Sequence, residues 1–321
     1  MMKKLYLALA ILTTIPVASF GQVFIQNTMF PMNKYVYNPA AAAASGTASI
    51  TGMYRSQWTG IKGNPNLATL GGEIPMAQIK GAVGGYFISD RLGPLATTGL
   101  NLSYAFRTSL GDPEEETTPT LSIGVNGGFT SKALNGQFTP SNTNIGEPLL
   151  NGQNNYNKSI IAPSLGAGIY FSGPKDRYYI GVSAQDLLEP SIKGLLAGNI
   201  STARVPRSYY VMGGYTFKVT ERTSIQPNVA YRTDGRVSQL DLNVLANIQP
   251  IVVGVGYRLN DSFSGILGVN VSDRFFMGYS YDYTTSKLNV SSDVHSHEVI
   301  LTYRFPEVKR FGGQYDNILQ K

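Results

Sequence analysis

Along most of this chain apolar and polar residues alternate, and the clearest example runs from Phe275 to Tyr283. Every second residue of that stretch is apolar or aromatic, and Gly278, Ser280 and Asp282 stand between them. A period of two residues is that of a β-strand, whose successive side chains leave on opposite faces. The stretch therefore predicts a strand with one apolar face and one face of small, polar side chains.

About fourteen segments of this kind follow one another, each close to the ~10 residues of a tilted membrane-spanning strand. A soluble sandwich also alternates, but a chain built almost wholly this way behind an export signal favours an outer-membrane barrel. The expected fold is all-β, a transmembrane antiparallel β-barrel of about 14 strands with both termini periplasmic. The expected strands span residues 47–58, 66–76, 80–89, 97–108, 119–131, 160–171, 178–187, 207–218, 223–232, 237–247, 251–259, 263–271, 275–283 and 296–305.

Residues 1–21 have the features of a secretory signal peptide. Two lysines precede an apolar run from Leu5 to Val17, and Ser19 and Gly21 supply the small residues of a cleavage site. A membrane-anchoring helix is the alternative interpretation, but the run is shorter than the ~20 residues that such a helix needs. We therefore expect cleavage after Gly21 and export to the cell outer membrane.

The mature chain divides into three expected parts. Residues 22–46 are too apolar for a free linker, so we expect them to pack inside the barrel or under it. Residues 47–305 form the barrel, and residues 306–321 are a polar, basic periplasmic tail.

The connections between the expected strands give an independent check on the barrel. When the connections are counted along the chain, the three longest all have odd numbers, so they lie at the same end of the barrel. They are residues 132–159, 188–206 and 284–295. Outer-membrane barrels have long outside loops and short periplasmic turns. With the amino terminus in the periplasm, all three long loops lie outside.

The composition excludes several classes of protein. Because the chain has no cysteine, disulfides, thiolate metal sites and a lipoprotein anchor are excluded. The formal charge is +6, and it falls to +4 without the two signal-peptide lysines because 24 basic and 20 acidic residues remain. The basic residues are scattered, so no nucleic-acid partner is expected.

Strand parity assigns six charged residues to the barrel lumen, because a lipid-facing charge near the midplane would cost ~2–4 kcal/mol. These candidate lumen charges are Arg107, Arg232, Asp241, Asp282, Glu298 and Arg304. They could line a polar pore, or they could pair with one another and keep the interior rigid and filled. The presence of both signs favours the paired interior, since pairing offsets desolvation.

The sequence contains no recognisable catalytic, phosphate-binding or cofactor-binding motif. No enzyme activity, catalytic residue or cofactor is therefore expected. The two histidines, His295 and His297, lie at the end of an expected outer loop. A His-x-His pair can bind metal, but no third ligand is evident, so a solvated loop end is the simpler interpretation and no metal is expected.

Motifs within these strands carry a resemblance to a known family. They are Asn38-Pro39-Ala40, Tyr54-Arg55-Ser56-Gln57-Trp58, Ser89-Asp90-Arg91-Leu92-Gly93-Pro94, Tyr179-Ile180-Gly181-Val182-Ser183, Gln239-Leu240-Asp241-Leu242-Asn243, Gly278-Tyr279-Ser280-Tyr281-Asp282-Tyr283 and Ser296-His297-Glu298. Because these motifs occur together and in this order, the chain resembles the PorP/SprF family of type IX secretion outer-membrane proteins from Bacteroidetes. It departs from the family where the strand near Val252 lacks the usual aromatic start, and in its longer tail after Phe305.

The resemblance implies a non-enzymatic barrel that supports protein secretion, gliding motility and attachment of adhesins to the cell surface. Its implied partners are the C-terminal domain of a secreted cargo protein at the outer face, periplasmic ring or motor-linked components of the machinery, and outer-membrane lipid. The most recognisable family motif, Arg55, Gln57 and Trp58, is expected to be structural, with Trp58 as an aromatic anchor at the outer interface. A channel for small solutes is the alternative function.

Overall fold

The computed structural model describes residues 25–112, 118–137, 155–190, 204–286 and 294–306 of the 321-residue chain. Within these residues the chain forms one sheet of fifteen strands. The strands are β1 (Ser49–Thr59), β2 (Asn66–Met76), β3 (Gly81–Leu92), β4 (Leu95–Ser109), β5 (Thr120–Gln137), β6 (Asn155–Ser172), β7 (Tyr178–Gln185), β8 (Ser208–Tyr215), β9 (Phe217–Lys218), β10 (Thr223–Thr233), β11 (Ser238–Ile248), β12 (Ile251–Arg258), β13 (Ser262–Asn270), β14 (Phe275–Thr284) and β15 (His295–Arg304).

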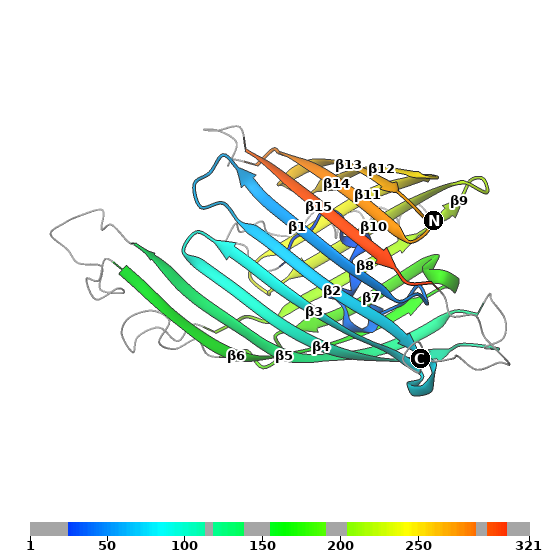
Figure 1. The fold of residues 1–321 in the computed structure, drawn as a ribbon, viewed down its shortest axis with the longest axis horizontal. Helices are drawn as coiled ribbons and strands as arrows, with labels where there is room; N and C mark the ends of the chain where they lie inside the picture. Colours follow the sequence, from blue (N-terminus) through cyan, green and yellow to red (C-terminus); the bar gives the residue numbers. More distant parts are fainter. Residues whose placement is uncertain (1–24, 113–117, 138–154, 191–203, 287–293, 307–321) are drawn as a thin grey trace, which may run out of the picture.

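The sheet closes into a barrel (Figure 1) because β1 pairs antiparallel with β2 on one side and with β15 on the other. β8 and β9 both pair with β10, so these two short strands share one position in a ring of fourteen. The expected antiparallel all-β barrel is therefore confirmed. Ser49 faces Arg304 across the closing pair, so β1 begins and β15 ends at the same mouth. Which side of the membrane this mouth faces stays a prediction.

The expectation of a single strand over residues 207–218 is wrong, because this strand is interrupted at Thr216. The backbone amide of Thr216 donates to the carbonyl of Arg177 at 2.7 Å. The break lies opposite a stretch of β10 that contains Pro227, which has no amide hydrogen to give to the ladder. Local loss of ladder bonds therefore separates β8 from β9.

Strand alternation gives the barrel an apolar outer face and a more polar inner face. In β14, Met277 and Tyr279 are exposed, whereas Ser280 and Asp282 are fully buried. Leu102, in the middle of β4, is 66% exposed. An outer face of this kind suits a lipid environment. Separately, no helix in the described part of the chain is long and apolar enough to cross a membrane.

The two mouths of the barrel differ in their connections. Residues 138–154, 186–207 and 285–294 join strands at one end, which we call the long-connection mouth. The opposite end, the short-turn mouth, has brief connections such as residues 249–250 between β11 and β12. The two longest connections, residues 138–154 and 186–207, therefore share one mouth, as strand parity predicts. Residues 285–294 are as long as residues 110–119, which join β4 to β5 at the short-turn mouth.

β5 and β6 are longer than expected, with 18 residues each. The expected loop over residues 132–159 is wrong at both ends, because paired strand continues to Gln137 and resumes at Asn155. At about 3.3 Å per residue each strand is ~60 Å long, which exceeds what a membrane-spanning strand needs. Figure 1 shows this hairpin projecting at the left, beyond the other strands.

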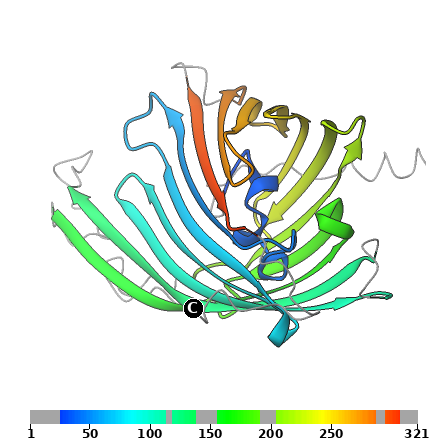
Figure 2. The same ribbon diagram turned by 45° about the vertical axis from the view of Figure 1, so that its right-hand side comes forward.

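Residues 25–46, which we call the lumen segment, lie inside the ring, where Figure 2 shows them in dark blue. Three short 3-10 helices fold the segment: η1 (Phe30–Met32), η2 (Lys34–Val36) and η3 (Pro39–Ala41). Its apolar side chains pack against inward-facing residues of the wall. These contacts include Phe30 and Tyr37 with Tyr170, Tyr179 and Tyr210, and Met29 with Leu245, Ile266 and Ile300. The hydrophobic core of the protein is thus in the barrel interior.

Candidate functional site: the barrel lumen

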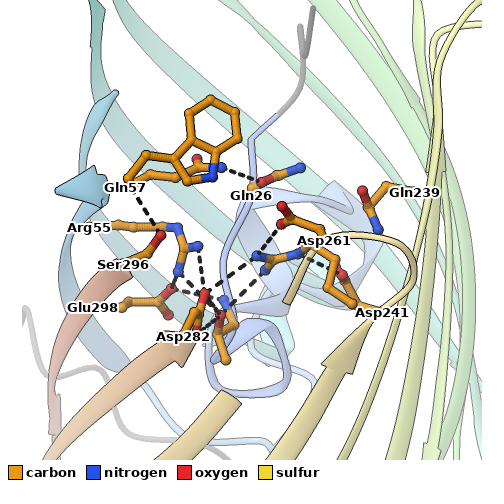
Figure 3. Close-up of polar contacts among 12 residues, drawn as sticks. Gln26, Arg55, Gln57, Gln239, Asp241, Asp261, Asp282, Ser296 and Glu298 are labelled. Carbon is orange, nitrogen blue, oxygen red and sulfur yellow. Dashed lines mark hydrogen bonds and ion pairs between the residues drawn. The ribbon is translucent and has the colours of Figure 1, made fainter. Parts of the chain in front are cut away.

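Seven charged side chains form a buried group inside the barrel, toward the long-connection mouth. Figure 3 labels Arg55, Asp241, Asp261, Asp282 and Glu298 of this group. We call this group the charge cluster. Six strands and one connection contribute to it, because each of these strands turns alternate residues inward. Its members are Arg55 of β1, Arg232 of β10, Asp241 of β11, Arg258 of β12, Asp261 of the β12–β13 connection, Asp282 of β14 and Glu298 of β15.

Arg55 joins two carboxylates that come from neighbouring strands. Its Nη2 lies 2.6 Å from Asp282 Oδ2, and its Nη1 lies 3.1 Å from Glu298 Oε2. All three side chains are at most 1% exposed. The guanidinium fork of arginine is suited to holding two carboxylates at once.

Arg258, at the end of β12, extends the cluster along the same side of the ring, toward β11 and β10. Its Nε lies 2.9 Å from Asp241 Oδ1, and its Nη1 lies 3.4 Å from an oxygen of Asp261 and from an oxygen of Asp282. Arg232 makes a second ion pair with Asp241. The cluster is therefore one connected network rather than a set of separate pairs.

The lumen segment supplies the centre of this network through Thr28. The Thr28 hydroxyl donates to Asp282 Oδ2 at 2.8 Å. It accepts hydrogen bonds from Arg55 Nη1 at 3.2 Å and from Arg258 Nη2 at 3.3 Å. A side chain of the lumen segment thus touches both arginines and the carboxylate that they share.

Backbone groups of the lumen segment also bind to the cluster. The amides of Thr28 and Met29 donate to the two oxygens of Glu298, at 2.8 and 2.9 Å. Arg232 Nη1 donates to the carbonyl of Ile25 at 2.6 Å. The charge cluster therefore holds the first described residues of the segment by both backbone and side chain.

A second set of contacts holds the segment near the short-turn mouth. Arg107 of β4 donates to the carbonyls of Ala43 and Ala42 at 2.8 and 2.7 Å. Glu73 of β2 accepts from the amide of Ala43 at 2.7 Å. These bonds satisfy backbone groups that have no partner in a strand or helix, which makes an irregular segment stable inside the barrel.

The motif Asn38-Pro39-Ala40 seats the segment against the wall. Asn38 Nδ2 donates to the carbonyl of Ile169 in β6, and Asn38 Oδ1 accepts from the amide of Ala40, both at 3.0 Å. Glycines leave room for this approach. A Cβ atom on Gly168 would lie 2.1 Å from Asn38 Oδ1, and one on Gly124 would lie 2.3 Å from the Ala40 nitrogen. The motif and the wall glycines are therefore parts of one contact.

The cluster holds three arginines and four carboxylates, so its charges nearly cancel. Removing charges from water costs several kcal/mol per ion, and close pairing with additional hydrogen bonds offsets that cost. Thr28 and the backbone amides beside it supply such bonds.

The structure places five of the six predicted lumen charges in interior contacts. Arg232, Asp241, Asp282 and Glu298 belong to the charge cluster, and Arg107 binds the lumen segment. These contacts are those of a paired interior rather than of an open polar lining. The sixth, Arg304, lines a cavity of about 380 Å³ at the short-turn mouth, together with the Lys34–Asp176 ion pair. What the six residues contribute to function stays a prediction.

Sequence reasoning did not place Arg258, Asp261 or Thr28 in the lumen, and it treated Arg55 only as part of a family motif. Parity alone could have found Arg258, because it lies two and four residues after the small, inward-facing Gly256 and Gly254. The contact of Thr28 with the cluster leaves no mark in the sequence, since it depends on how an irregular segment folds inside the ring.

The two histidines lie beside tyrosines of β14. His297 Nδ1 is 2.7 Å from the Tyr279 hydroxyl, and the His295 ring packs at 5.2 Å from that of Tyr281. Within the described residues no group of three or more histidines and carboxylates is arranged to hold a metal ion. The aromatic contacts account for the placement of both imidazoles.

A comparison with family models decides the relationship. The model described as type IX secretion system membrane protein PorP/SprF matches residues 19–303. The chain belongs to this family. The match covers the lumen segment and nearly all of the barrel, so this PorP/SprF protein is an outer-membrane β-barrel of the type IX secretion system.

Several solved structures are similar to this PorP/SprF chain at low sequence identity. The CymD monoaromatic hydrocarbon channel has a TM-score of 0.51 and 11% identity, with 89% of this chain and 95% of that chain covered. A Pseudomonas aeruginosa FadL homologue has a TM-score of 0.46 and 13% identity, with 89% and 96% covered. Acinetobacter baumannii Omp33 has a TM-score of 0.44 and 9% identity, with 81% and 98% covered. No curated protein matches the chain.

Proposed function

We propose that this PorP/SprF barrel is a closed binding partner rather than a conduit. In this role it supports secretion and cell-surface attachment of exported adhesins, by binding their C-terminal domain, by linking to periplasmic ring or motor-linked components, or by both. The observation that carries the proposal is the lumen segment. The buried charge cluster binds this irregular segment, and glycines of the wall leave room for it. These contacts favour a segment that remains in the lumen.

The long-connection mouth is the face that suits the exported protein. It carries the longest connections of the barrel and the projecting β5–β6 hairpin, and long loops of outer-membrane barrels lie on the outside. The short-turn mouth suits periplasmic components, because the chain leaves β15 there and the cavity beside Arg304 lies there. One barrel could in this way be contacted from both sides of the outer membrane.

Deletion of the gene tests this proposal. We expect the surface display of a specific adhesin to be lost, while uptake of small solutes across the outer membrane stays normal. Re-expression of the intact chain should restore display. Normal display in the deletion strain would refute the role for that adhesin, and lost solute uptake with normal display would favour the alternative function, a channel for small solutes.

A further inference from the structure

The lumen segment begins close to the long-connection mouth. The carbonyl of Ile25 accepts from Arg232, which lies one residue before the end of β10 at that mouth. The side-chain oxygen of Gln26 accepts from Gln57 Nε2 at 3.0 Å, and Gln57 lies two residues before the end of β1. Figure 3 shows Gln26 beside Gln57, on the same side of the charge cluster.

The same segment ends at the opposite mouth. Ala43 binds Glu73 and Arg107, which lie near the ends of β2 and β4 at the short-turn mouth. Ser49 then begins β1 at that mouth. Between Ile25 and Ser49 the chain therefore crosses the lumen once, from the long-connection mouth to the short-turn mouth.

We propose that the mature amino terminus is presented at the long-connection mouth, opposite the mouth where β15 ends. If cleavage follows Gly21, only three residues precede Ile25. Three extended residues span ~10 Å. The 11 residues of β1 cover ~36 Å along the strand, or ~25 Å along the barrel axis at a tilt of about 45°. Three residues are too short to return to the short-turn mouth.

The lumen segment also occupies part of that return route. Asn27 and Thr28 are at most 5% exposed, and Thr28 and the ion pairs around it fill the interior beside β10–β12, β14, β15 and β1. This proposal differs from the expectation that both termini are periplasmic, because it keeps only the carboxyl end of the barrel at the short-turn mouth. The amino end of the mature chain lies on the other face, which is the one that the proposed function assigns to the exported protein.

Cysteine labelling in whole cells tests the proposal, because the chain has no cysteine of its own. Val23→Cys marks the amino end. Lys62→Cys, in the exposed connection after β1, marks the long-connection mouth, and Asp273→Cys, in the exposed turn before β14, marks the short-turn mouth. A membrane-impermeant maleimide is applied to intact cells and to cells with a permeabilised outer membrane.

We expect Val23→Cys to be labelled under the same condition as Lys62→Cys, and not only under the condition that labels Asp273→Cys. Labelling together with Asp273→Cys, or protection under both conditions, would overturn the proposal. Correct insertion of each variant is checked by its heat-dependent migration on gels. Because labelling reports position and not adhesin display, its outcome is independent of whether the proposed function holds.

Discussion

Replacing Arg55 with methionine should release the lumen segment from the charge cluster. The change removes the 2.6 Å contact to Asp282 and the 3.1 Å contact to Glu298, and it leaves two fully buried carboxylates short of positive charge. Breaking a buried ion pair by removing one partner costs about 3–5 kcal/mol. Methionine fills much of the volume of the arginine stem, so the loss is mainly electrostatic.

Most of that cost falls on the state in which the segment is bound. When the segment leaves, water enters the lumen and hydrates both carboxylates, so the released state is penalised much less. A difference of about 3–5 kcal/mol corresponds to an increase of roughly 10²- to 10⁴-fold in the released population. Because Arg258 still contacts Asp282 in the variant, we expect an increase in the released population near the lower end of this range.

The released population can be measured with a cysteine at position 27. Asn27 is fully buried and its side-chain atoms make no hydrogen bond among the described residues, so Asn27→Cys removes no such contact. The rate of maleimide labelling of the purified full-length protein in detergent then reports how often the segment opens. Arg55→Met should accelerate this labelling by at least about 100-fold relative to the Asn27→Cys background.

Arg91→Met is the matched control, because Arg91 is an exposed arginine on β3. An exposed charge of this kind contributes little to stability, so labelling should change by less than about fivefold. If Arg55→Met labels no faster than Arg91→Met, the charge cluster does not hold the lumen segment.

The contacts and the faces of the strands give two further predictions, each with a matched control. Gly124→Ala should clash with the backbone of Ala40 and cost about 1–3 kcal/mol, which would raise labelling of Asn27→Cys by roughly 5- to 150-fold. Gly265→Ala should leave labelling unchanged, because a Cβ there meets no atom within 4 Å. Leu102→Arg, on the lipid face at the middle of β4, should lower the free energy of unfolding in lipid vesicles by ~2–4 kcal/mol in urea titrations. Leu110→Arg, just beyond the end of β4, should cost less than about 1 kcal/mol, and equal costs at the two positions would contradict the assignment of the lipid face.

Much of the barrel wall could be predicted from the sequence, because the alternation of apolar and polar residues within each strand shows which residues face outward and which face inward. The alternation in β14 predicts an inward Asp282, and the residue is fully buried. Asp241 and Glu298 were placed inward by the same rule. Parity, however, says only which side of the wall a residue faces, and it cannot say which charges pair inside the lumen.

The contacts inside the lumen could not be predicted, since they depend on the path of an irregular segment. Thr28 lies 254 residues before Asp282 in the chain, and no local pattern relates the two. The packing of the Asn38 motif on Gly168 is likewise invisible in a strand pattern, where a glycine reads only as a small residue. The extension of β5 to Gln137 was missed because residues 132–137 do not alternate strongly between apolar and polar.

Conductance in planar lipid bilayers tests most directly whether the lumen segment closes the barrel. The intact protein should show no stable open conductance, and a variant lacking residues 25–46 should show open steps of uniform size. Arg55→Met should show brief open steps, so that its mean conductance lies between those of the intact protein and the deletion variant. A stable open conductance of the intact protein, unchanged when residues 25–46 are removed, would contradict a closed barrel and support a solute channel.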